Sequence, residues 1–341
     1  MTKTGILVVG DLCPDIIVAG VPTTGTRLRF GQAEDVVTGT SMVLGSSAGI
    51  TACAIAAAGG EAQLLAVVGD DSMGEACRQW LTERGVDTRF VRVDATVATG
   101  SSVVLVRRDD TCDRQILTHL GAMQSLEAGD VTDVALRLSS HLHVSSFFLH
   151  TRARADLHQR MSRARQLGLT VSLDTNDDPQ RRWRDGAQAA IAASDVLFVN
   201  DGEAIGLAGL GRQAGPEHAV QRLLAAMPKH GSDSRYPAVV HKRGPDGASV
   251  HTRAGVTHVN APATDVVDTV GAGDTLAGTA LAALTKGADW PSALALAVAA
   301  GTMSTHAAGG VAAQAPLSQT AALAATLLVT IDHDEALEGT S

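Results

Sequence analysis

The chain has 341 residues, and its 27 Lys and Arg against 36 Asp and Glu give a formal net charge of −9 at pH 7. This acidic balance argues against a nucleic-acid partner, because such a partner needs a basic face that neutralises phosphates. Hydrophobic residues make up 45% of the chain, which is enough to bury a large core. Aromatic residues supply only 3%, so Ala, Val, Leu and 35 glycines must do the packing, as in α/β proteins.

Cysteine usage and hydropathy predict the compartment. Cys13, Cys53, Cys77 and Cys112 form no CxxC pair, which indicates reduced thiols rather than a zinc site or a disulfide framework. The N-terminus lacks a basic leader with a cleavage site, and no apolar run approaches the roughly 18 residues of a membrane span. We therefore expect a cytoplasmic protein with no membrane partner.

Short apolar runs alternate with longer helical segments along most of the chain. Strands are predicted at residues 6–9, 64–68, 142–144, 170–173, 196–199 and 238–240. Helices are predicted between them at residues 48–58, 73–84, 152–167, 184–193 and 217–227. This alternation predicts an α/β fold with a doubly wound, mostly parallel sheet that is flanked by helices and binds ligands at the carboxyl ends of its strands.

Two segments interrupt the alternation. Residues 14–37 and 89–118 contain short alternating runs and no long helix, which predicts a small antiparallel β lid inserted into an α/β nucleotide- and substrate-binding domain. That domain would comprise residues 1–13, 38–88 and 119–330. Its last third is predicted to be helical, at residues 274–284, 291–306 and 317–328, and the polar residues 331–341 are predicted to form a flexible tail.

The segment at residues 265–284, DVVDTVGAGDTLAGTALAAL, leads from a Gly-rich turn into a small-residue helix. Gly271 and Gly273 let the backbone approach a ligand closely, and the free amides at a helix start favour an anion. Asp274, in the first helical turn, could accept a proton from a substrate hydroxyl. This combination suits phosphoryl transfer, although a helix cap after a tight turn is the commoner explanation of a bare GxGD.

The sequence DTVGAGD resembles the second signature of the PfkB, or ribokinase-like, family of carbohydrate and nucleoside kinases. Four further motifs occur in the order typical of that family: GDLCPDI near the N-terminus, a segment at residues 45–74 that ends in GDDxxG, NDGE at residues 200–203 and HKRGPDGA at residues 241–248. A Walker A loop and a dinucleotide fingerprint are both absent from the sequence. The resemblance covers essentially the whole chain and implies a ribokinase-like fold.

The resemblance also implies catalytic roles. Asp274 would be the catalytic base, and Gly271, Ala272 and Gly273 would supply the amides of an anion hole for the transferring phosphoryl group.

The resemblance implies ATP, Mg²⁺ and, in some members, K⁺ as cofactors. Asn200 and Glu203 would order the magnesium and phosphate waters, although Glu203 could instead cap a helix. Asp268 and the neighbouring backbone resemble the monovalent-cation loop of some members. Lys242 could reach the ATP phosphates or be a solvated surface charge.

The remaining nucleotide contacts are predicted from position in the family pattern. Gly244 and Gly247 would shape the edge of the nucleotide site. His306 falls where members line the adenine pocket, and a packed helix histidine is the alternative.

The acceptor side departs from the family pattern. Asp15 matches the sugar-binding aspartate, with Asp11 as the alternative register, and Gly45 matches the first of two glycines. The second glycine position holds Ser46, and Ile50 stands where many sugar kinases carry a sugar-binding asparagine. Because Ile50 can form no hydrogen bond with its side chain, a hydroxyl contact is lost or moved, and Ser46 or Ser47 could compensate.

A second departure follows a predicted strand. Residues 174–183, DTNDDPQRRW, resemble the D-x-N-x-R-P stretch of ketodeoxygluconate and fructose kinases, but Asp178 stands where those carry Arg. An acidic sugar thereby loses one anchor. Four arginines in or beside the predicted lid could hold an anionic acceptor or protect an exposed strand edge: Arg27, Arg29, Arg89 and Arg92.

We therefore expect an ATP-dependent kinase that transfers the γ-phosphate to a hydroxyl of a sugar or sugar-like molecule. A nucleoside kinase of the same fold is the nearest alternative, and a sugar-binding protein without activity is the other, because of Ile50. A homodimer formed through the small sheet is also expected.

Overall fold

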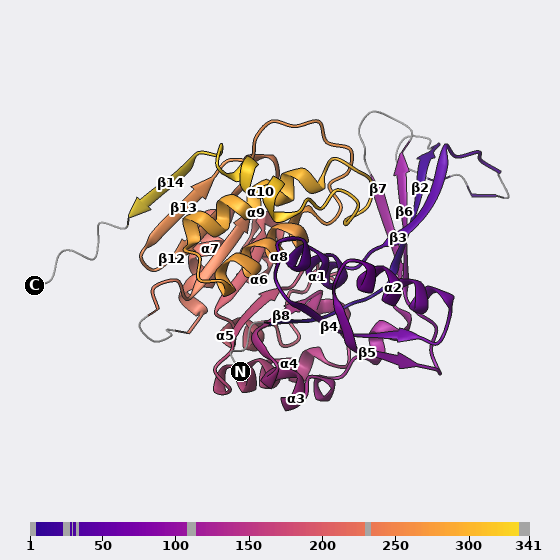
Figure 1. Ribbon diagram of the computed structural model, residues 1–341, viewed down its shortest axis with the longest axis horizontal. Helices are drawn as coiled ribbons and strands as arrows, with labels where there is room; N and C mark the ends of the chain where they lie inside the picture. The colour runs from indigo at the N-terminus through magenta and orange to yellow at the C-terminus, as the bar shows by residue number, and fades with distance from the viewer. Residues whose placement is uncertain are drawn as a thin grey trace, which may run out of the picture.

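The computed structural model describes residues 5–22, 28, 30–31, 34–107, 114–228 and 233–333. They form a layered α/β body with a second, smaller sheet projecting from one side (Figure 1). The predicted fold class, a large and mostly parallel sheet flanked by helices with an additional small sheet, is confirmed.

The large sheet has ten strands in the order β14-β13-β12-β11-β10-β9-β8-β1-β4-β5. The seven strands from β11 to β5 are parallel, and β12, β13 and β14 add to one edge in antiparallel pairs. In chain order the strands are β1 (Gly5–Val9), β4 (Ala62–Gly69), β5 (Asp87–Asp94), β8 (Ser139–Ser145), β9 (Thr170–Asp174), β10 (Val196–Asn200), β11 (Ala238–Lys242), β12 (Ala248–Thr252), β13 (Gly255–Val259) and β14 (Val329–His333).

The strand order reverses between β1 and β8. From β1 the chain adds β4 and β5 on one side, and later β8 to β11 on the other. Crossovers on the two sides of such a switch leave a crevice at the carboxyl ends of the strands, where open α/β sheets bind their ligands.

Helices cover both faces of the large sheet, as the alternation in the sequence predicts. One face carries α1 (Ser47–Ala57), α2 (Ser72–Glu83), α8 (Ala272–Thr285) and α9 (Trp290–Ser304), with α10 (Leu317–Ala324) beside α9. The other face carries α3 (Asp133–Arg137), α4 (Arg154–Gln166), α5 (Ala187–Ala192), α6 (Asp201–Leu207) and α7 (Pro216–Ala226). Five short 3₁₀ turns lie within the described residues: η1 (Gly121–Ser125), η2 (Ala128–Asp130), η3 (Phe147–Leu149), η4 (Arg212–Ala214) and η5 (Gly244–Asp246).

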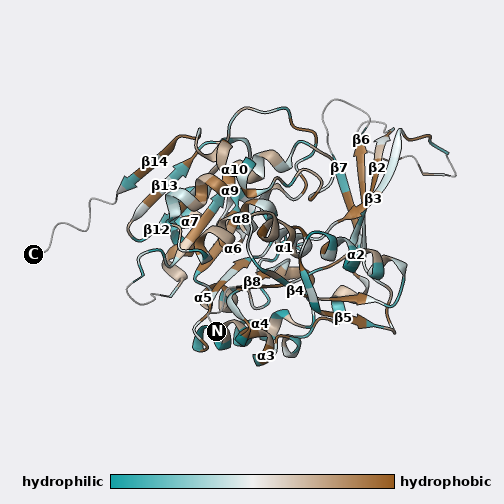
Figure 2. Cartoon of the chain, in the orientation of Figure 1, coloured by the Kyte–Doolittle hydropathy of each residue, from teal (hydrophilic) through white to brown (hydrophobic). Residues whose placement is uncertain are grey.

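Two hydrophobic cores follow from the two-residue period of the strands. In β1, Ile6 and Val8 belong to one core and Leu7 and Val9 to the other, and all four are fully buried. Figure 2 shows hydrophobic residues along these strands and hydrophilic ones on outer helices such as α2 and α4. Glycine permits close helix packing, since a Cβ on Gly278 of α8 would lie 2.5 Å from the carbonyl oxygen of Thr51 in α1.

The small sheet has the strand order β3-β2-β6-β7. Its strands are β2 (Pro14–Val21), β3 (Gly39–Leu44), β6 (Ser101–Arg107) and β7 (Arg114–His119). The two outer pairs, β2 with β3 and β6 with β7, are antiparallel, whereas the central pair of β2 with β6 is parallel.

Three predicted boundaries differ from the strands observed. Residues 89–94, predicted as part of the lid, form most of β5 in the large sheet, and β3, predicted within the α/β domain, belongs to the small sheet. Residues 331–333, predicted as tail, continue β14. An alternating pattern identifies a strand with one buried face but does not say which sheet receives it.

Several predicted features lie partly outside the described residues. Cys13, Cys53 and Cys77 are free and buried, in agreement with reduced thiols, and Cys112 lies outside the described residues. Arg27, Arg29 and residues 334–341 also lie outside them. Among the helices that the structure describes, none is both long enough and apolar enough to cross a membrane.

Candidate active site

The start of α8 carries the Gly-rich turn. Gly271 has a φ of 72°, in the left-handed region that favours glycine, and α8 begins at Ala272. A Cβ on Gly271 would lie 2.8 Å from the Cα of Gly310, so a later loop packs directly on this turn. The first amides of a helix have no partner within it and can therefore bind an anion, although here the amide of Ala272 also donates to the carbonyl oxygen of Thr269 at 3.3 Å.

Asp274 lies in the first turn of α8 and is buried. Its Oδ1 accepts a long hydrogen bond, 3.4 Å, from Nδ2 of Asn176. Burial, and then the neighbouring carboxylate of Asp174, raise the pKa of Asp274 to about 7, against the opposing charge of Lys242. A carboxyl group with this pKa can take a proton from a bound hydroxyl near neutral pH.

Lys242, the last residue of β11, joins the acidic side chains of the site. Its Nζ donates to Oδ2 of Asp174 at 2.6 Å and lies 3.7 Å from Oε2 of Glu203. Burial alone would lower the pKa of Lys242, but the charges of Asp174 and Glu203 outweigh burial and hold it above its ordinary value. A Cβ on Gly273 would lie 3.3 Å from Cδ of Lys242, so this side chain lies beside the Gly-rich turn. The alternative of a solvated surface charge does not fit, because only 12% of the side chain is exposed.

Asn200 and Glu203 form a reciprocal cap at the start of α6. The Asn200 side chain accepts from the amide of Glu203 at 2.9 Å, and Oε2 of Glu203 accepts from the amide of Asn200 at 2.8 Å. Glu203 is buried, and burial raises its pKa. Glu203 therefore does cap α6, which was the alternative to a role in binding, and the same carboxylate lies 3.7 Å from Nζ of Lys242.

Three positions predicted to contact the nucleotide have local structural roles. Gly247 has a φ of 82°, and a Cβ there would lie 2.1 Å from the carbonyl oxygen of Val259. Gly244 has a φ of 57°, with open space around it. His306 follows α9, is exposed and forms a hydrogen bond through Nε2 with the hydroxyl of Thr264. Nucleotide binding by these three residues stays a prediction.

The residues predicted to bind the acceptor lie where β1 leads into β2 and β3 leads into α1. Asp15 is buried, and a Cβ on Gly45 would lie 2.1 Å from its Oδ1, so glycine leaves the space that the carboxyl group occupies. Burial, followed by the charges of Asp11 and Asp268, raises the pKa of Asp15 to about 7, and Arg114 opposes this. Acidic groups thus converge at this end of the crevice.

The two serines considered as substitutes for lost contacts lie at the start of α1. Ser46 has a φ of 70°, which is uncommon for a residue with a side chain, and its hydroxyl donates to the carbonyl oxygen of Gly45. The amides of Ser47 and Ala48 donate to the two carboxylate oxygens of Asp11 at 3.2 and 3.0 Å. Asp11, the alternative to Asp15, therefore caps α1.

Ile50 is buried in α1 and packs on the Gly-rich turn. A Cβ on Gly310 would lie 2.3 Å from Cδ1 of Ile50, and one on Gly271 would lie 3.0 Å from it. The carbonyl oxygen of Ile50 accepts from Nε2 of Gln314 at 3.0 Å, and the same Nε2 donates to Oγ1 of Thr275. The Ile50 side chain thus packs against the Gly-rich turn, at a position where the family pattern predicted a contact with the acceptor.

Asp268 ties together three segments near the same turn. Its Oδ1 accepts from the amide of Val270 and from Nη1 of Arg114, both at 2.9 Å, and its Oδ2 accepts from the amide of Gly309 at 2.9 Å. A monovalent cation in this loop stays a prediction, and backbone carbonyls would have to hold it, because donors already surround this carboxylate.

These motifs match a known family over most of the chain. The model of the pfkB family of carbohydrate kinases matches residues 8–316. The chain belongs to this family of kinases. It is 33% identical over 261 residues to the ATP-dependent ribose-1-phosphate kinase of Halopiger xanaduensis, covering 76% of this chain and 79% of that protein. It is 30% identical over 264 residues to the aminoimidazole riboside kinase of Salmonella typhimurium, covering 73% and 76%.

A solved structure supports the fold assignment of this PfkB kinase. The ribokinase of Arabidopsis thaliana, solved with ribose and ATP, has a TM-score of 0.79 and 20% sequence identity, covering 95% of this chain and 99% of that chain. The predicted family, fold and enzyme class, a kinase, are thereby confirmed.

Sequence reasoning assigned no role to three residues that organise the site of this kinase, although the first two belong to the D-x-N stretch that it identified: Asp174, Asn176 and Gln314. Asp174 ends β9 and Asn176 follows it, and Oδ1 of Asn176 also accepts from the amide of Ser146 at 2.8 Å. The carboxyl ends of parallel strands meet at one edge, so their position after a predicted strand was a usable signal. Gln314 carried no such signal.

The remaining polar candidates have local partners. Asp178 accepts hydrogen bonds from the backbone amides of Gln180, Arg182 and Trp183, and these hold its pKa below the ordinary value although burial acts to raise it. Arg92 donates to the carbonyl oxygen of Ser125 and to Asp130, and Arg89 pairs with Asp87. Neither Arg89 nor Arg92 belongs to the small sheet.

Proposed function

We propose that this PfkB kinase transfers the γ-phosphate of ATP to a hydroxyl group of a neutral, sugar-like acceptor. The observation that carries the proposal is the buried carboxyl group of Asp274 in the first turn of a helix that begins directly after a glycine turn, where backbone amides can bind an anion. A base and an anion hole in one helical turn suit phosphoryl transfer, which depends on positioning and charge stabilisation.

Asp274 would take the proton of the acceptor hydroxyl as the oxygen attacks the phosphoryl group. Nδ2 of Asn176 would donate to the Asp274 carboxylate and orient it. The Asn176 side chain is itself fixed, because its Oδ1 accepts a hydrogen bond from the amide of Ser146. The amides of the residues at 271–273 would stabilise the charge on the transferring group, with the ammonium of Lys242 beside them.

Magnesium would bind with the nucleotide near Asn200 and Glu203. The donor set fits through water, because Mg²⁺ usually keeps several of its waters and the buried carboxylate of Glu203, which lies 3.7 Å from Nζ of Lys242, can accept hydrogen bonds from them. When bound, the ion would neutralise charge on the phosphate oxygens. Gly244, Gly247 and His306 would line the remainder of the nucleotide site.

The acceptor is proposed to be neutral because acidic groups converge where it would bind. The carboxyl group of Asp15, which occupies the space left by the missing side chain of Gly45, would accept hydrogen bonds from acceptor hydroxyls. A phosphate group on the acceptor would be repelled by the carboxylates of Asp11 and Asp15. The small sheet would close over the acceptor as a lid and exclude water. Arg114 of β7 is the group that would favour a phosphorylated acceptor instead.

An acceptor panel tests this function directly. The purified protein with Mg²⁺-ATP would be offered pentoses, hexoses, sugar acids, a sugar phosphate such as ribose-1-phosphate, and nucleosides, and ADP release would be measured. Release that is fastest with a neutral sugar supports the proposal. Fastest release with ribose-1-phosphate or a nucleoside overturns the acceptor class, and sugar binding without ADP release identifies a binding protein.

We also propose a homodimer formed through the small sheet. Its outer strands expose apolar side chains, with Met42 of β3 46% exposed, Ile116 of β7 50% and Leu117 of β7 47%. Light scattering on the wild type and on Ile116→Glu tests this, and a wild-type monomer would contradict it.

A further inference from the structure

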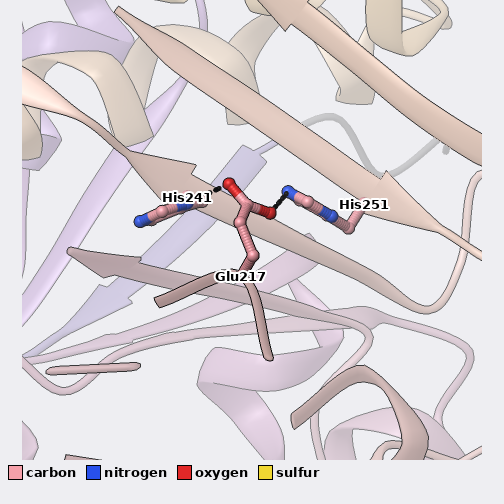
Figure 3. A group of neighbouring side chains, drawn as sticks. All are labelled: Glu217, His241 and His251. Carbon is pink, nitrogen blue, oxygen red and sulfur yellow. Dashed lines mark ion pairs between the residues drawn. The ribbon is translucent and has the colours of Figure 1, made fainter. Parts of the chain in front are cut away.

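A second cluster of chemically reactive side chains lies away from the start of α8, where α7 covers β11 and β12. Glu217 comes from the first turn of α7, His241 from β11 and His251 from β12. Both histidines are buried with 2% of their side chains exposed, whereas 60% of the Glu217 side chain is exposed. Figure 3 shows the Glu217 carboxylate between the two imidazoles.

The three side chains present donor atoms to one another. Nδ1 of His241 lies 3.9 Å from Oε1 of Glu217, and Nε2 of His251 lies 3.7 Å from Oε2 (Figure 3). One ligand atom from each of the three residues lies within 4.8 Å of the others. This spacing is a little wider than the separation of ligands around one small ion, and the exposed Glu217 side chain can move to close it.

His241 is oriented as metal-binding histidines usually are. Its Nε2 lies 2.7 Å from Oδ1 of Asp201, and because a carboxylate only accepts, Nε2 carries the proton. In the neutral ring Nδ1 then presents a lone pair, and this buried Nδ1 has no hydrogen-bond partner. Histidine ligands commonly donate their other ring N–H to a carboxylate, which fixes the tautomer and raises the basicity of the ligating nitrogen.

A lone pair of Nδ1 that faces a carboxylate oxygen across 3.9 Å is an unfavourable pair unless a cation lies between them. We propose that Glu217, His241 and His251 bind a divalent transition-metal ion of the Zn²⁺ class. Two imidazoles and one carboxylate are a common Zn²⁺ ligand set, whereas Mg²⁺ and Ca²⁺ prefer oxygen ligands. The ligands of the proposed site therefore differ in chemistry from those of the magnesium site proposed near Asn200 and Glu203.

The neighbours of His251 are consistent with ligation. Oγ of Ser249 lies 2.9 Å from Nε2 of His251, so the hydroxyl would turn aside when the nitrogen binds metal. A ring nitrogen binds a metal through its lone pair, and Nε2 of His251 can present one on the side that faces Glu217. An ion there would fasten α7 to β11 and β12 at three points.

Zn²⁺ titration of the full chain tests the site. Competition with a chromophoric chelator would be run in excess Mg²⁺ and without nucleotide, so that the carboxylates of the kinase site are occupied. The informative variant is Glu217→Gln, which keeps the shape of an exposed side chain. The matched control is His218→Ala, which removes the exposed neighbouring imidazole on α7. The melting temperature with and without Zn²⁺ gives a second readout that does not depend on kinase activity.

The wild type and His218→Ala should bind one Zn²⁺ per chain and melt at a higher temperature with it. Asp201→Asn should weaken binding by about 10–100-fold, as loss of an outer partner of a ligand does, and Glu217→Gln by at least as much. Absence of stoichiometric Zn²⁺ binding by the wild type would overturn the proposal. So would unchanged affinity in Glu217→Gln.

Discussion

The phosphoryl-transfer end and the acceptor end of the crevice are built in different ways. At the first, backbone groups predominate, since a glycine turn with a φ of 72° leads into the N-terminus of α8 and one buried carboxyl group lies in its first turn. At the second, side chains fill the space, with Asp15 packed over Gly45 and Ile50 packed beneath the Gly271 turn. Backbone geometry suits any phosphate, whereas side chains determine which acceptor fits.

The difference also explains where this kinase departs from its family. Ser46 and Ile50 stand at positions where the family pattern predicts acceptor contacts, and neither belongs to the Gly-rich turn or is the carboxyl group at α8. The Ile50 side chain packs against Gly271 and Gly310. A position predicted for one end of the crevice therefore contributes to packing at the other end. Four changes to the chain would break or sharpen this contrast.

The largest expected effect comes from removing the base. Asp274→Asn should lower kcat about 10³-fold, within the range that general acid–base catalysis contributes, because the amide cannot accept the hydroxyl proton. ATP affinity should stay close to that of the wild type, since the backbone amides and Lys242 remain. Coupled ADP release and calorimetry measure the two quantities, with Asp332→Asn, an exposed position on β14, as the control. Retention of wild-type turnover would remove Asp274 from the mechanism.

At the acceptor end, Gly45→Ala should raise the KM for the acceptor about 10–100-fold, because its Cβ would lie 2.1 Å from Oδ1 of Asp15 and displace that carboxyl group. The kcat at saturating acceptor should change less. Gly39→Ala, on the same strand β3 with open space at its Cβ, is the matched control. Equal effects of the two substitutions would show that Asp15 does not bind the acceptor.

Replacing Ile50 by the asparagine that many sugar kinases carry at this position should lower the stability of this protein. Ile50→Asn would place an amide without partners against Gly271 and Gly310, and should lower the free energy of unfolding by about 2–4 kcal/mol. Ile50→Val, which keeps the packing partly, should cost only about 0.5–1.5 kcal/mol. Denaturant unfolding measures both. A stable Ile50→Asn protein with tighter acceptor binding would mean that the side chain faces the acceptor.

The smallest effect is a pH dependence of stability. The pKa of Asp15 is raised from 3.8 to about 7, so the folded state holds a proton that the unfolded state releases, and stability falls as pH rises through this window. Asp15→Asn should therefore gain in melting temperature relative to the wild type between pH 5 and pH 8, by about a few degrees. Thermal melts at both values measure this.

The control for that measurement is Asp94, whose pKa is lowered to about 2 mainly by hydrogen bonds from Thr96. Its contribution is lost only in acid, so Asp94→Asn should show no growing gain over the same pH window. A constant difference between Asp15→Asn and the wild type would mean that Asp15 is already ionised when buried.

The sequence predicted the parallel sheet and the start of α8 because both depend on local patterns. Buried strands between helices can be read from hydrophobic runs, and a glycine turn before a helix can be read from GAGD. The predicted helix at 274–284 and the observed α8 (Ala272–Thr285) agree closely. The sheet membership of β3 and β5 could not be read in this way, because it is decided by partners far along the chain.

Side-chain roles at the site divide along the same line. Gly247 belongs to the predicted motif, but the reason for glycine there is the nearby carbonyl oxygen of Val259, which no local pattern displays. The capping box of Asn200 and Glu203 was readable from spacing. The contact of Lys242 with Asp174, 68 positions apart in the chain, was not readable from spacing. It arises because β9 and β11 both pair with β10, which brings the carboxyl ends of these strands together.

The contacts that brace α1 against α8 have a consequence for how the protein folds. Thr51 donates to the carbonyl oxygen of Asp274 across 223 positions of sequence, and Gln314 donates to the carbonyl oxygen of Ile50 across 264. Contacts of such sequence separation close large loops and form slowly. During refolding from denaturant, we expect helical structure to return early and catalytic turnover to return only when α1 has packed against α8 and Gln314.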